Sequence, residues 1–473
     1  MSSFPSIASA GRRLAAALLV TPVLGFAQSS PSWSTRLDSV ARAAIAGAGT
    51  PGATIAVVVD GRVAYLQGYG LANVETGQPM TSQMLLRVGS VSKMFTGALL
   101  AELEERGALD MQRPIARYVP SLQGKRVGAV TTHQLMTHNA GWLDNAVAYG
   151  RMGEGALGEV MREVGDTLFF TEPGRTFSYS NPSISMAGYV AEAATGKRFG
   201  TLVDSLMLRP LGMPRSTFRP LEALTWPIAM GHDPAGKGTS TVVRPMPENT
   251  AQWPAGFLFT SAPELARFAI MLMNGGQIDG RQIMSRGAVR RLATGYVPLP
   301  GRGVMDSLTY GYGLMVGSIR LNGRSEPVWT HGGSINGYNA ELLMLPERKA
   351  AVMVLVNGAP QAIAPIMSAA WQGVIGAPWP QPATATVRTA TAAEKSALVG
   401  RYAMAANVLE LVDVDGQLML RQNGQSVPVQ MESSTAFTAR LPNGATMRLS
   451  ARLENGRATY LYAGSRALAR QAP

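Results

Sequence analysis

The chain has 473 residues, no cysteine, a formal net charge of +12 at pH 7 and only 15% charged residues. The length allows two or three domains with an ample buried core. The lack of cysteine excludes disulfides, thiolate nucleophiles, iron–sulfur clusters and cysteine-ligated zinc, so any covalent catalysis must use oxygen or nitrogen. Lysine and arginine are scattered singly, without basic runs, and we therefore expect no nucleic-acid partner.

The first residues indicate export. Arg12 and Arg13 precede an apolar stretch over 14–26, and Gly25 and Ala27 place small residues three and one positions before a cut after Ala27. This is the pattern of a secretory signal peptide, and the apolar run is too short to span a bilayer; an uncleaved anchor is the alternative. We expect a signal peptide over 1–27 and a periplasmic or secreted mature protein without a membrane span.

A helix is predicted over 33–48, and two strand patterns over 53–59 and 62–66 then flank Asp60-Gly61, a dipeptide typical of a tight hairpin. The next pattern predicts an amphipathic helix that begins around Ser90 and ends before Gly107, with its charged residues on the face opposite the apolar ones. Positions three apart share a helix face, so the Lys93 amine can reach the Ser90 hydroxyl. The ordinary alternative is that Ser90 caps the helix and Lys93 is a solvated side chain.

From about 106 to 267 the pattern is helical and rich in loops, with short helices expected over 133–137, 158–163, 182–194 and 264–273. Strand patterns return over 312–320, 326–330, 339–345 and 350–356, and a helix is expected over 362–374. Strands at both ends of a helical middle predict an α/β fold in which distant parts of the chain close one mixed sheet.

The C-terminal part has a different pattern. A Pro-rich linker is expected over 376–394, followed by a small antiparallel β-barrel domain over 395–473. The barrel prediction rests on repeated hairpin dipeptides between short alternating strands, which are Asp415-Gly416, Asn423-Gly424, Asn443-Gly444 and Asn455-Gly456. No catalytic group of residues is apparent in this part of the sequence.

Two further short motifs carry polar groups suited to catalysis. Tyr179-Ser180-Asn181 precedes Pro182, and its ordinary explanation is that Asn181 caps a helix while Tyr179 is a buried aromatic. In His331-Gly332-Gly333-Ser334 a strand meets two glycines, which permit close approach of backbone to a ligand. The ordinary explanation for this second motif is a turn with an incidental histidine.

Taken in order, Ser90-Val91-Ser92-Lys93, Tyr179-Ser180-Asn181 and His331-Gly332-Gly333 resemble the three-motif signature of the class C β-lactamase superfamily of serine hydrolases. Stretches over 135–141, 254–268 and 342–358 are similar to other segments of that superfamily, and the resemblance covers about residues 35–375. It implies a mostly antiparallel sheet flanked by helices, with an inserted all-helical region, over 28–375. The C-terminal domain resembles the lipocalin-like barrels appended to some members.

The resemblance implies a role for each motif residue. Ser90 would form an acyl-enzyme, with Lys93 as the base, whose pKa must fall from about 10.4 to about 7 by burial or neighbouring charge. Tyr179 would relay the proton to the leaving group, and Asn181 would hydrogen-bond the acyl side of the substrate. The oxyanion hole would use backbone N–H groups of Ser90 and Ser334, beside Gly332 and Gly333.

His331 stands where the β-lactamases proper have lysine. A mostly neutral histidine supplies a hydrogen bond to Tyr179 or to substrate, but no permanent charge for a carboxylate, and activity should fall as it protonates at acidic pH. The implied reaction is therefore hydrolysis of amides in D-amino-acid peptides, as in DD-carboxypeptidases and D-aminopeptidases, or of carboxylic esters. The alternatives are a β-lactamase, an acyltransferase or macrocyclase, and a non-catalytic penicillin-binding receptor.

The remaining histidines and serines suggest no second site. His133 and His138 are five positions apart, off a common helix face and without a third ligand between them, so we expect no metal and no cofactor. We expect His138 to be structural and Ser92 to point away from the site. The expected partner is a small-molecule or peptide substrate, and no pattern fixes the oligomeric state.

Overall fold

The computed structural model describes residues 31–472, apart from 237, 302, 382–385 and 443. The predicted signal peptide over 1–27 lies outside the described residues. None of the described helices combines the length and the apolar character needed to cross a bilayer.

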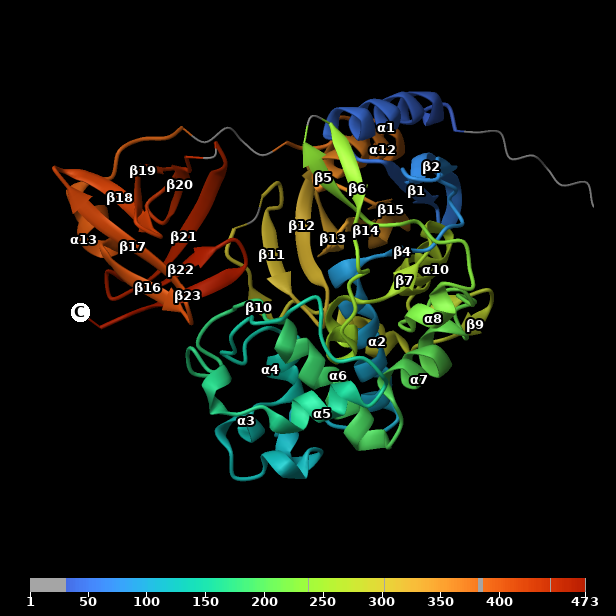
Figure 1. Ribbon diagram of the computed structural model, residues 1–473, viewed down its shortest axis with the longest axis horizontal. Coiled ribbons are helices and arrows are strands. Elements are labelled where there is room, and N and C mark those ends of the chain that lie inside the picture. Colours follow the sequence, from blue (N-terminus) through green and yellow to red (C-terminus); the bar gives the residue numbers. More distant parts are fainter. Residues whose placement is uncertain (1–30, 237, 302, 382–385, 443, 473) are drawn as a thin grey trace, which may run out of the picture.

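A large antiparallel sheet forms the centre of the first part of the chain (Figure 1). Among the described residues it has nine strands in the order β10-β11-β12-β13-β14-β15-β1-β2-β3. These are β1 (Gly52–Val59), β2 (Arg62–Asn73), β3 (Gln78–Pro79), β10 (Val297–Pro298), β11 (Ser307–Tyr310), β12 (Met315–Leu321), β13 (Arg324–Ile335), β14 (Tyr338–Leu345) and β15 (Ala350–Val356). Ala53 of β1 lies opposite Val356 of β15, which confirms that distant parts of the chain close one sheet.

Local sequence determines the predicted hairpins. Asp60 and Gly61 both have positive φ, 50° and 74°, as a tight turn between β1 and β2 requires. Smaller two-stranded pairs lie outside the main sheet and comprise β4 (Leu86–Arg87) with β7 (Phe259–Thr260), β5 (His232–Gly236) with β6 (Thr239–Val242), and β8 (Gln277–Ile278) with β9 (Arg281–Gln282).

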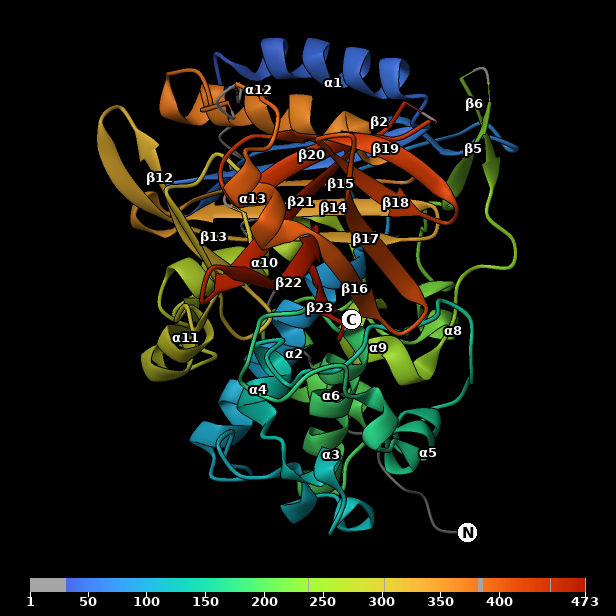
Figure 2. The same cartoon turned by 90° about the vertical axis from the view of Figure 1, so that its left-hand side faces the viewer.

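Helices cover both faces of the sheet and fill the inserted region. They are α1 (Ser34–Ala48), α2 (Ser92–Glu105), α3 (Arg126–Ala129), α4 (Thr132–Met136), α5 (Ala156–Glu163), α6 (Asn181–Thr195), α7 (Phe199–Val203), α8 (Pro220–Ala223), α9 (Trp253–Gly256), α10 (Ala262–Met273), α11 (Arg286–Leu292) and α12 (Ile363–Ile375). Helices α1 and α12 lie side by side on one face, as Figure 2 shows, and α2 and α10 lie on the other. The helices between α2 and α10 form the predicted helical region.

Helix α2 is more deeply buried than the predicted amphipathic pattern indicates. Its residues from Ser92 to Leu103 are all buried, because α2 runs between the sheet and the helical region. Phe95 stacks on Phe268 of α10 with ring centroids 4.0 Å apart. The backbone of Tyr312 approaches Gly97 so closely that an added Cβ would lie 2.0 Å from its carbonyl oxygen. The helix therefore forms part of the core and holds its first turn rigidly.

The predicted C-terminal barrel is confirmed. Eight antiparallel strands close on themselves within the described residues, and their bounds are β16 (Gly400–Met404), β17 (Asn407–Val414), β18 (Gln417–Gln422), β19 (Gln425–Met431), β20 (Ala436–Arg440), β21 (Thr446–Glu454), β22 (Arg457–Ala463) and β23 (Arg466–Arg470). Turn residues Asp415, Asn423 and Asn455 have positive φ, each followed by a glycine with positive φ. A helix, α13 (Ala392–Leu398), begins inside the predicted linker.

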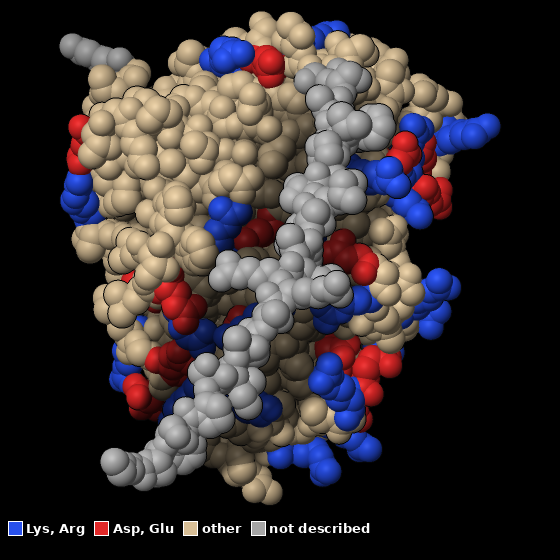
Figure 3. Space-filling model, turned by 90° about the vertical axis from the view of Figure 1, so that its right-hand side faces the viewer, with Lys and Arg blue, Asp and Glu red and all other residues tan. Residues whose placement is uncertain are grey.

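The charged residues do not gather by sign on the face seen in Figure 3. There, Lys and Arg are interspersed with Asp and Glu around a largely uncharged surface. This distribution agrees with the scattered basic residues of the sequence, whose many arginines are paired with carboxylates, as in Arg244–Glu75 and Arg348–Glu326.

Candidate active site

Ser90 lies in a short 3₁₀ turn, η1 (Gly89–Val91), that leads directly into α2. Lys93 follows in the first turn of α2, and its Nζ lies 3.0 Å from Ser90 Oγ and 2.6 Å from Asn181 Oδ1, with the Ala255 carbonyl also in contact. The amide oxygen and the carbonyl can only accept hydrogen bonds. These two acceptors use both N–H groups of a neutral amine, so its lone pair is left to accept the Ser90 O–H.

Burial favours the neutral form of the Lys93 amine, which this arrangement requires. Its side chain is completely buried, and burial lowers the pKa of the amine to about 7, with the Arg466 charge acting in the same direction and Asp144 opposing it. A large fraction of Lys93 is therefore neutral near pH 7. The sequence interpretation in which Lys93 is a solvated side chain is wrong.

Tyr179 lies beside this pair. Lys93 Nζ is 4.8 Å from the centre of the Tyr179 ring. The phenol oxygen is buried and completes no hydrogen bond with a described residue. Burial has the largest effect on the pKa of Tyr179 and holds it above its ordinary value, while the nearby Ser90 hydroxyl acts to lower it. Tyr179 is thus a neutral phenol at pH 7, suited to passing on a proton and not to acting as the initial base.

His138 packs against the Tyr179 ring and binds the backbone next to it. Its Nδ1 accepts a hydrogen bond from the Ser180 N–H at 3.1 Å, and its ring lies 4.2 Å from the Tyr179 ring, centroid to centroid. Burial lowers the pKa of His138 well below its ordinary value, so the ring is neutral. These contacts favour the predicted structural role. Ser92 also points away from the site, since its hydroxyl donates to the Gly89 carbonyl and accepts from the Leu258 N–H.

The third motif is not the turn of its ordinary explanation, because His331 to Ser334 lie within the long strand β13. The pairing of β12 with β13 ends where Met315 lies opposite Thr330, and β13 continues past η1. An added Cβ on Gly333 would lie 1.9 Å from the Val88 carbonyl oxygen, so glycine is required for this approach. The backbone nitrogens of Ser90 and Ser334 thereby line the same wall of the site.

His331 has a different partner from the one expected. Its Nδ1 lies 2.6 Å from the Gly332 carbonyl oxygen and its Nε2 lies 2.9 Å from the Tyr310 hydroxyl. A carbonyl can only accept, so Nδ1 carries the proton and Tyr310 donates to Nε2. Burial first, and the Lys93 charge second, lower the pKa of His331 to about 3. Any loss of activity through protonation of His331 is therefore expected at a more acidic pH than an unperturbed histidine would give.

Asn181 is not the helix cap of its ordinary explanation. Ser180 caps α6 by accepting from the Ser183 N–H, and Asn181 is the first helical residue. Its Oδ1 accepts from Lys93 and its Nδ2 donates to Asp144 Oδ1 at 3.1 Å. The amide group is thus engaged in orienting Lys93, while the residue still lines the cavity next to Ser90.

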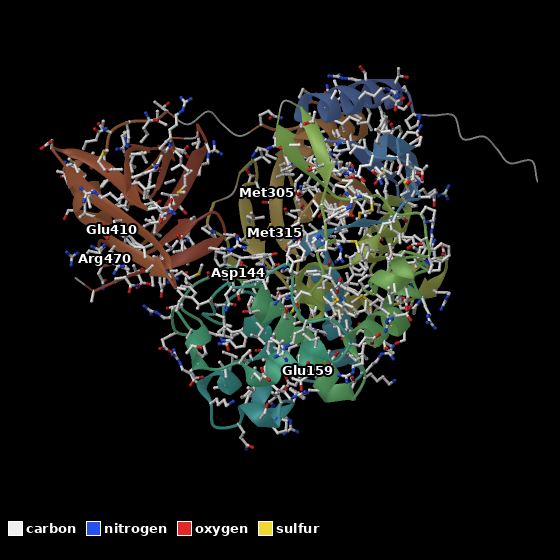
Figure 4. The ribbon with its side chains drawn as sticks, in the orientation of Figure 1. Asp144, Glu159, Met305, Met315, Glu410 and Arg470 are labelled. Atoms are coloured by element: carbon white, nitrogen blue, oxygen red, sulfur yellow. The ribbon has the colours of Figure 1, made fainter. Side chains whose placement is uncertain are left out.

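The C-terminal barrel contributes directly to this site, which the sequence did not indicate. The Ser465 carbonyl accepts a hydrogen bond from the Tyr179 N–H at 3.0 Å, and the Ala467 N–H donates to Ser178 Oγ at 3.1 Å. Arg466 Nε lies 2.7 Å from Asp144 Oδ2, and its guanidinium is 5.5 Å from the centre of the Tyr179 ring. Figure 4 places Asp144 where the helical region meets the barrel.

Two cavities meet at Ser90. One, of about 190 Å³, lies between Asn181 and the loop over 146–148. The other is a groove of about 540 Å³ that passes Tyr179, His331 and Arg466 and continues over Gly332. A substrate bound with one half in each would place its reacting bond at Ser90. Among the described residues, no group of three or more His, Asp or Glu side chains is arranged to hold a metal ion.

Comparisons with known proteins agree with this geometry. The profile of the beta-lactamase family matches residues 37–370. The chain is 31% identical over 205 residues to esterase EstB of Burkholderia gladioli, a match to 40% of this chain and 52% of that protein. It is 29% identical over 353 residues to a D-aminopeptidase of Gluconobacter oxydans, which covers 72% of this chain and 63% of the relative. The chain therefore spans less than two thirds of either protein. The solved structure of SurE superimposes with a TM-score of 0.75 at 23% identity, covering 93% of this chain and 99% of SurE.

Proposed function

Because the chain belongs to the beta-lactamase family of serine hydrolases, we propose that it is an exported enzyme that forms an acyl-enzyme at Ser90. Its proposed substrates are amides of D-amino-acid peptides or carboxylic esters. The observation that carries this proposal is the 3.0 Å contact between Ser90 Oγ and the buried Lys93 amine, whose pKa is lowered to about 7. Relatives named as an esterase and a D-aminopeptidase support the substrate classes.

The reaction follows from the contacts of these groups. Ser90 Oγ attacks the substrate carbonyl carbon while its proton passes to the neutral Lys93 amine. The backbone N–H groups of Ser90 and Ser334 stabilise the oxyanion, an effect worth about 3–4 kcal/mol per donor. When the tetrahedral intermediate collapses, the leaving group takes a proton through the Tyr179 phenol and Lys93 becomes neutral again. Water then attacks the ester bond to Ser90 by the same proton route and releases the acid.

His331 favours a peptidase or esterase over a β-lactamase. Its pKa of about 3 leaves it neutral throughout the physiological range, so it offers no positive charge for the carboxylate of a β-lactam. Its hydrogen bond to Tyr310 instead fixes one wall of the groove.

A panel of substrates tests the proposal. The protein without residues 1–27 should release p-nitrophenol from a p-nitrophenyl ester or cleave a D-Ala-D-Ala peptide, with slow or no hydrolysis of nitrocefin. Ser90→Ala should abolish turnover and the acyl adduct detected by mass spectrometry. A stoichiometric burst without turnover on every substrate would favour the penicillin-binding receptor instead, and undiminished activity of Ser90→Ala would refute the proposal.

The pH dependence of kcat/KM should report Lys93. The base must be neutral, so activity should rise with pH through a midpoint near the Lys93 pKa of about 7. No further loss should appear between pH 8 and 5 from His331, whose pKa of about 3 lies below that range. Initial rates at substrate concentrations well below KM measure this profile, and a pH-independent rate over the same range would contradict it.

Arg466→Met provides the matched test of that assignment. Asp144 and Arg466 are the charged side chains that act on the Lys93 pKa, in opposite directions, whereas His138 and His331 are neutral. Removing the Arg466 charge should raise the Lys93 pKa and move the midpoint of the profile to higher pH. Arg401→Met, on an exposed part of the barrel, should leave the midpoint unchanged.

Acyl transfer is a second candidate because two cavities meet at Ser90. One can hold the acyl group while the other admits a nucleophile other than water. Adding an amine or alcohol to the ester assay should then give ligated product at the expense of the free acid. Mass spectrometry of the products separates the two reactions.

A further inference from the structure

The groove that begins at Ser90 extends over β13 to the opposite face of the sheet. It passes Gly332 and reaches Glu341 on β14 and the start of α12 at Ile363 and Ala364. Glu341 lies opposite Gly332 in the strand register, so the Glu341 side chain lies on the face of the sheet toward which a side chain at position 332 would point. An added Cβ on Gly332 would lie 2.7 Å from Glu341 Oε2. Glycine here opens the path between Ser90 and the Glu341 carboxyl.

Glu341 has a carboxyl group without a cationic partner. Its Oε1 accepts from the Thr330 hydroxyl at 2.8 Å, and no ion pair joins it to any of the residues that the structure describes. Burial raises its pKa to about 7, and the hydrogen bond from Thr330 offsets this effect only in part. The side chain remains partly open to the groove. By contrast, the other charged group in the groove, Arg466, is already paired with Asp144.

A second, apolar cavity of about 520 Å³ adjoins the groove at Glu341. The two share Glu341, Ile363 and Ala364 and are lined further on by Leu343, Met367, Trp371 and Trp379. Trp371 and Trp379 stack with ring centroids 5.3 Å apart. An occupant of the groove would therefore meet a carboxylate first and aromatic surface beyond it.

We propose that Glu341 is a specificity-determining residue that binds a protonated amine of the substrate, in the part of the groove between Gly332 and the Trp371–Trp379 cavity. This subsite rests on the proposed acyl chemistry at Ser90, because it defines which substrates or nucleophiles are held beside that serine. An ammonium group fits this site, since it would form the ion pair that the Glu341 carboxylate lacks. The substrate class is an amine with an apolar extension.

Equilibrium binding separates this inference from catalysis. Hexylamine, protonated at about pH 8, and hexan-1-ol would be titrated by calorimetry into the Ser90→Ala protein. The amine should bind at least about ten-fold more tightly than the alcohol. In the Ser90→Ala protein, the second substitution Glu341→Gln, which keeps the shape of the side chain, should remove this preference for the amine over the alcohol. Adding Glu347→Gln, on the exposed turn after β14, should keep it.

Gly332→Ala is an independent probe, because its methyl group would displace the Glu341 carboxylate. It should also reduce the preference for the amine, and thermal unfolding verifies that each variant is folded. Equal binding of the two ligands, or a preference retained in Glu341→Gln, would overturn the subsite. Absence of Ser90-dependent turnover in the unsubstituted protein would refute the proposed function alone, since the amine preference is measured without catalysis.

Discussion

Lys93→Met should lower kcat/KM by about 10³-fold, within the range of about 10²–10⁴ that a positioned base contributes. Methionine retains an unbranched side chain in the buried site but cannot accept the Ser90 proton. The loss should lie in the formation of the acyl-enzyme, because Ser90 is deprotonated in that step. Single-turnover acylation followed by mass spectrometry would measure it.

The control for this substitution is Lys197→Met, at an exposed lysine after α6, which should acylate at the unsubstituted rate. Thermal unfolding of both variants distinguishes loss of the base from loss of the fold. If Lys93→Met acylated at the normal rate, the geometry of the Ser90–Lys93 pair would have no catalytic meaning.

Tyr179→Phe should lower activity by about 10²–10⁴-fold and yet make the protein more stable. The Tyr179 hydroxyl is buried, and although the nearby Ser90 hydroxyl acts on its pKa, it completes no hydrogen bond with a described residue. A buried unpaired polar group costs about 1–3 kcal/mol. Phenylalanine keeps the ring against His138 and removes that cost. Denaturant unfolding and kcat/KM on the same preparation would measure the two opposite effects.

Tyr310→Phe is the matched comparison. Tyr310 is as deeply buried, but its hydroxyl donates to His331 Nε2, so its loss should destabilise the protein by about 1 kcal/mol. If Tyr179→Phe were less stable than the unsubstituted protein, the Tyr179 hydroxyl would have a hydrogen-bond partner in the resting enzyme. If the variant kept full activity, Tyr179 would not take part in the proton transfer.

The sequence was most informative where structure depends on neighbouring residues. Asp60-Gly61 adopts the backbone conformation that its hairpin requires, and the three-residue spacing from Ser90 to Lys93 brings their side chains together as helix geometry predicts. The spacing of the three motifs also identified the family. Each of these features is fixed by local geometry or by a short motif.

The prediction failed where remote packing decides the outcome. Helix α2 has charged residues near its end, but the surrounding layers bury it from Ser92 to Leu103. His331 is buried beside Lys93, and burial together with the Lys93 charge lowers its pKa to about 3, which no neighbouring residue in the sequence indicates. Asp144 and Arg466 lie 322 positions apart in the chain, and no short motif marks either residue. Only the folded chain brings them together.

The hydrogen bond from the Tyr179 N–H to the Ser465 carbonyl has a consequence for the timing of biosynthesis. The chain is made from its N-terminal end, so Ser90, Lys93 and Tyr179 emerge well before the turn between β22 and β23 that carries Ser465. A nascent hydrolase domain would hold its tyrosine segment without this acceptor. Full reactivity would then begin only once the barrel has been synthesised and has folded against it.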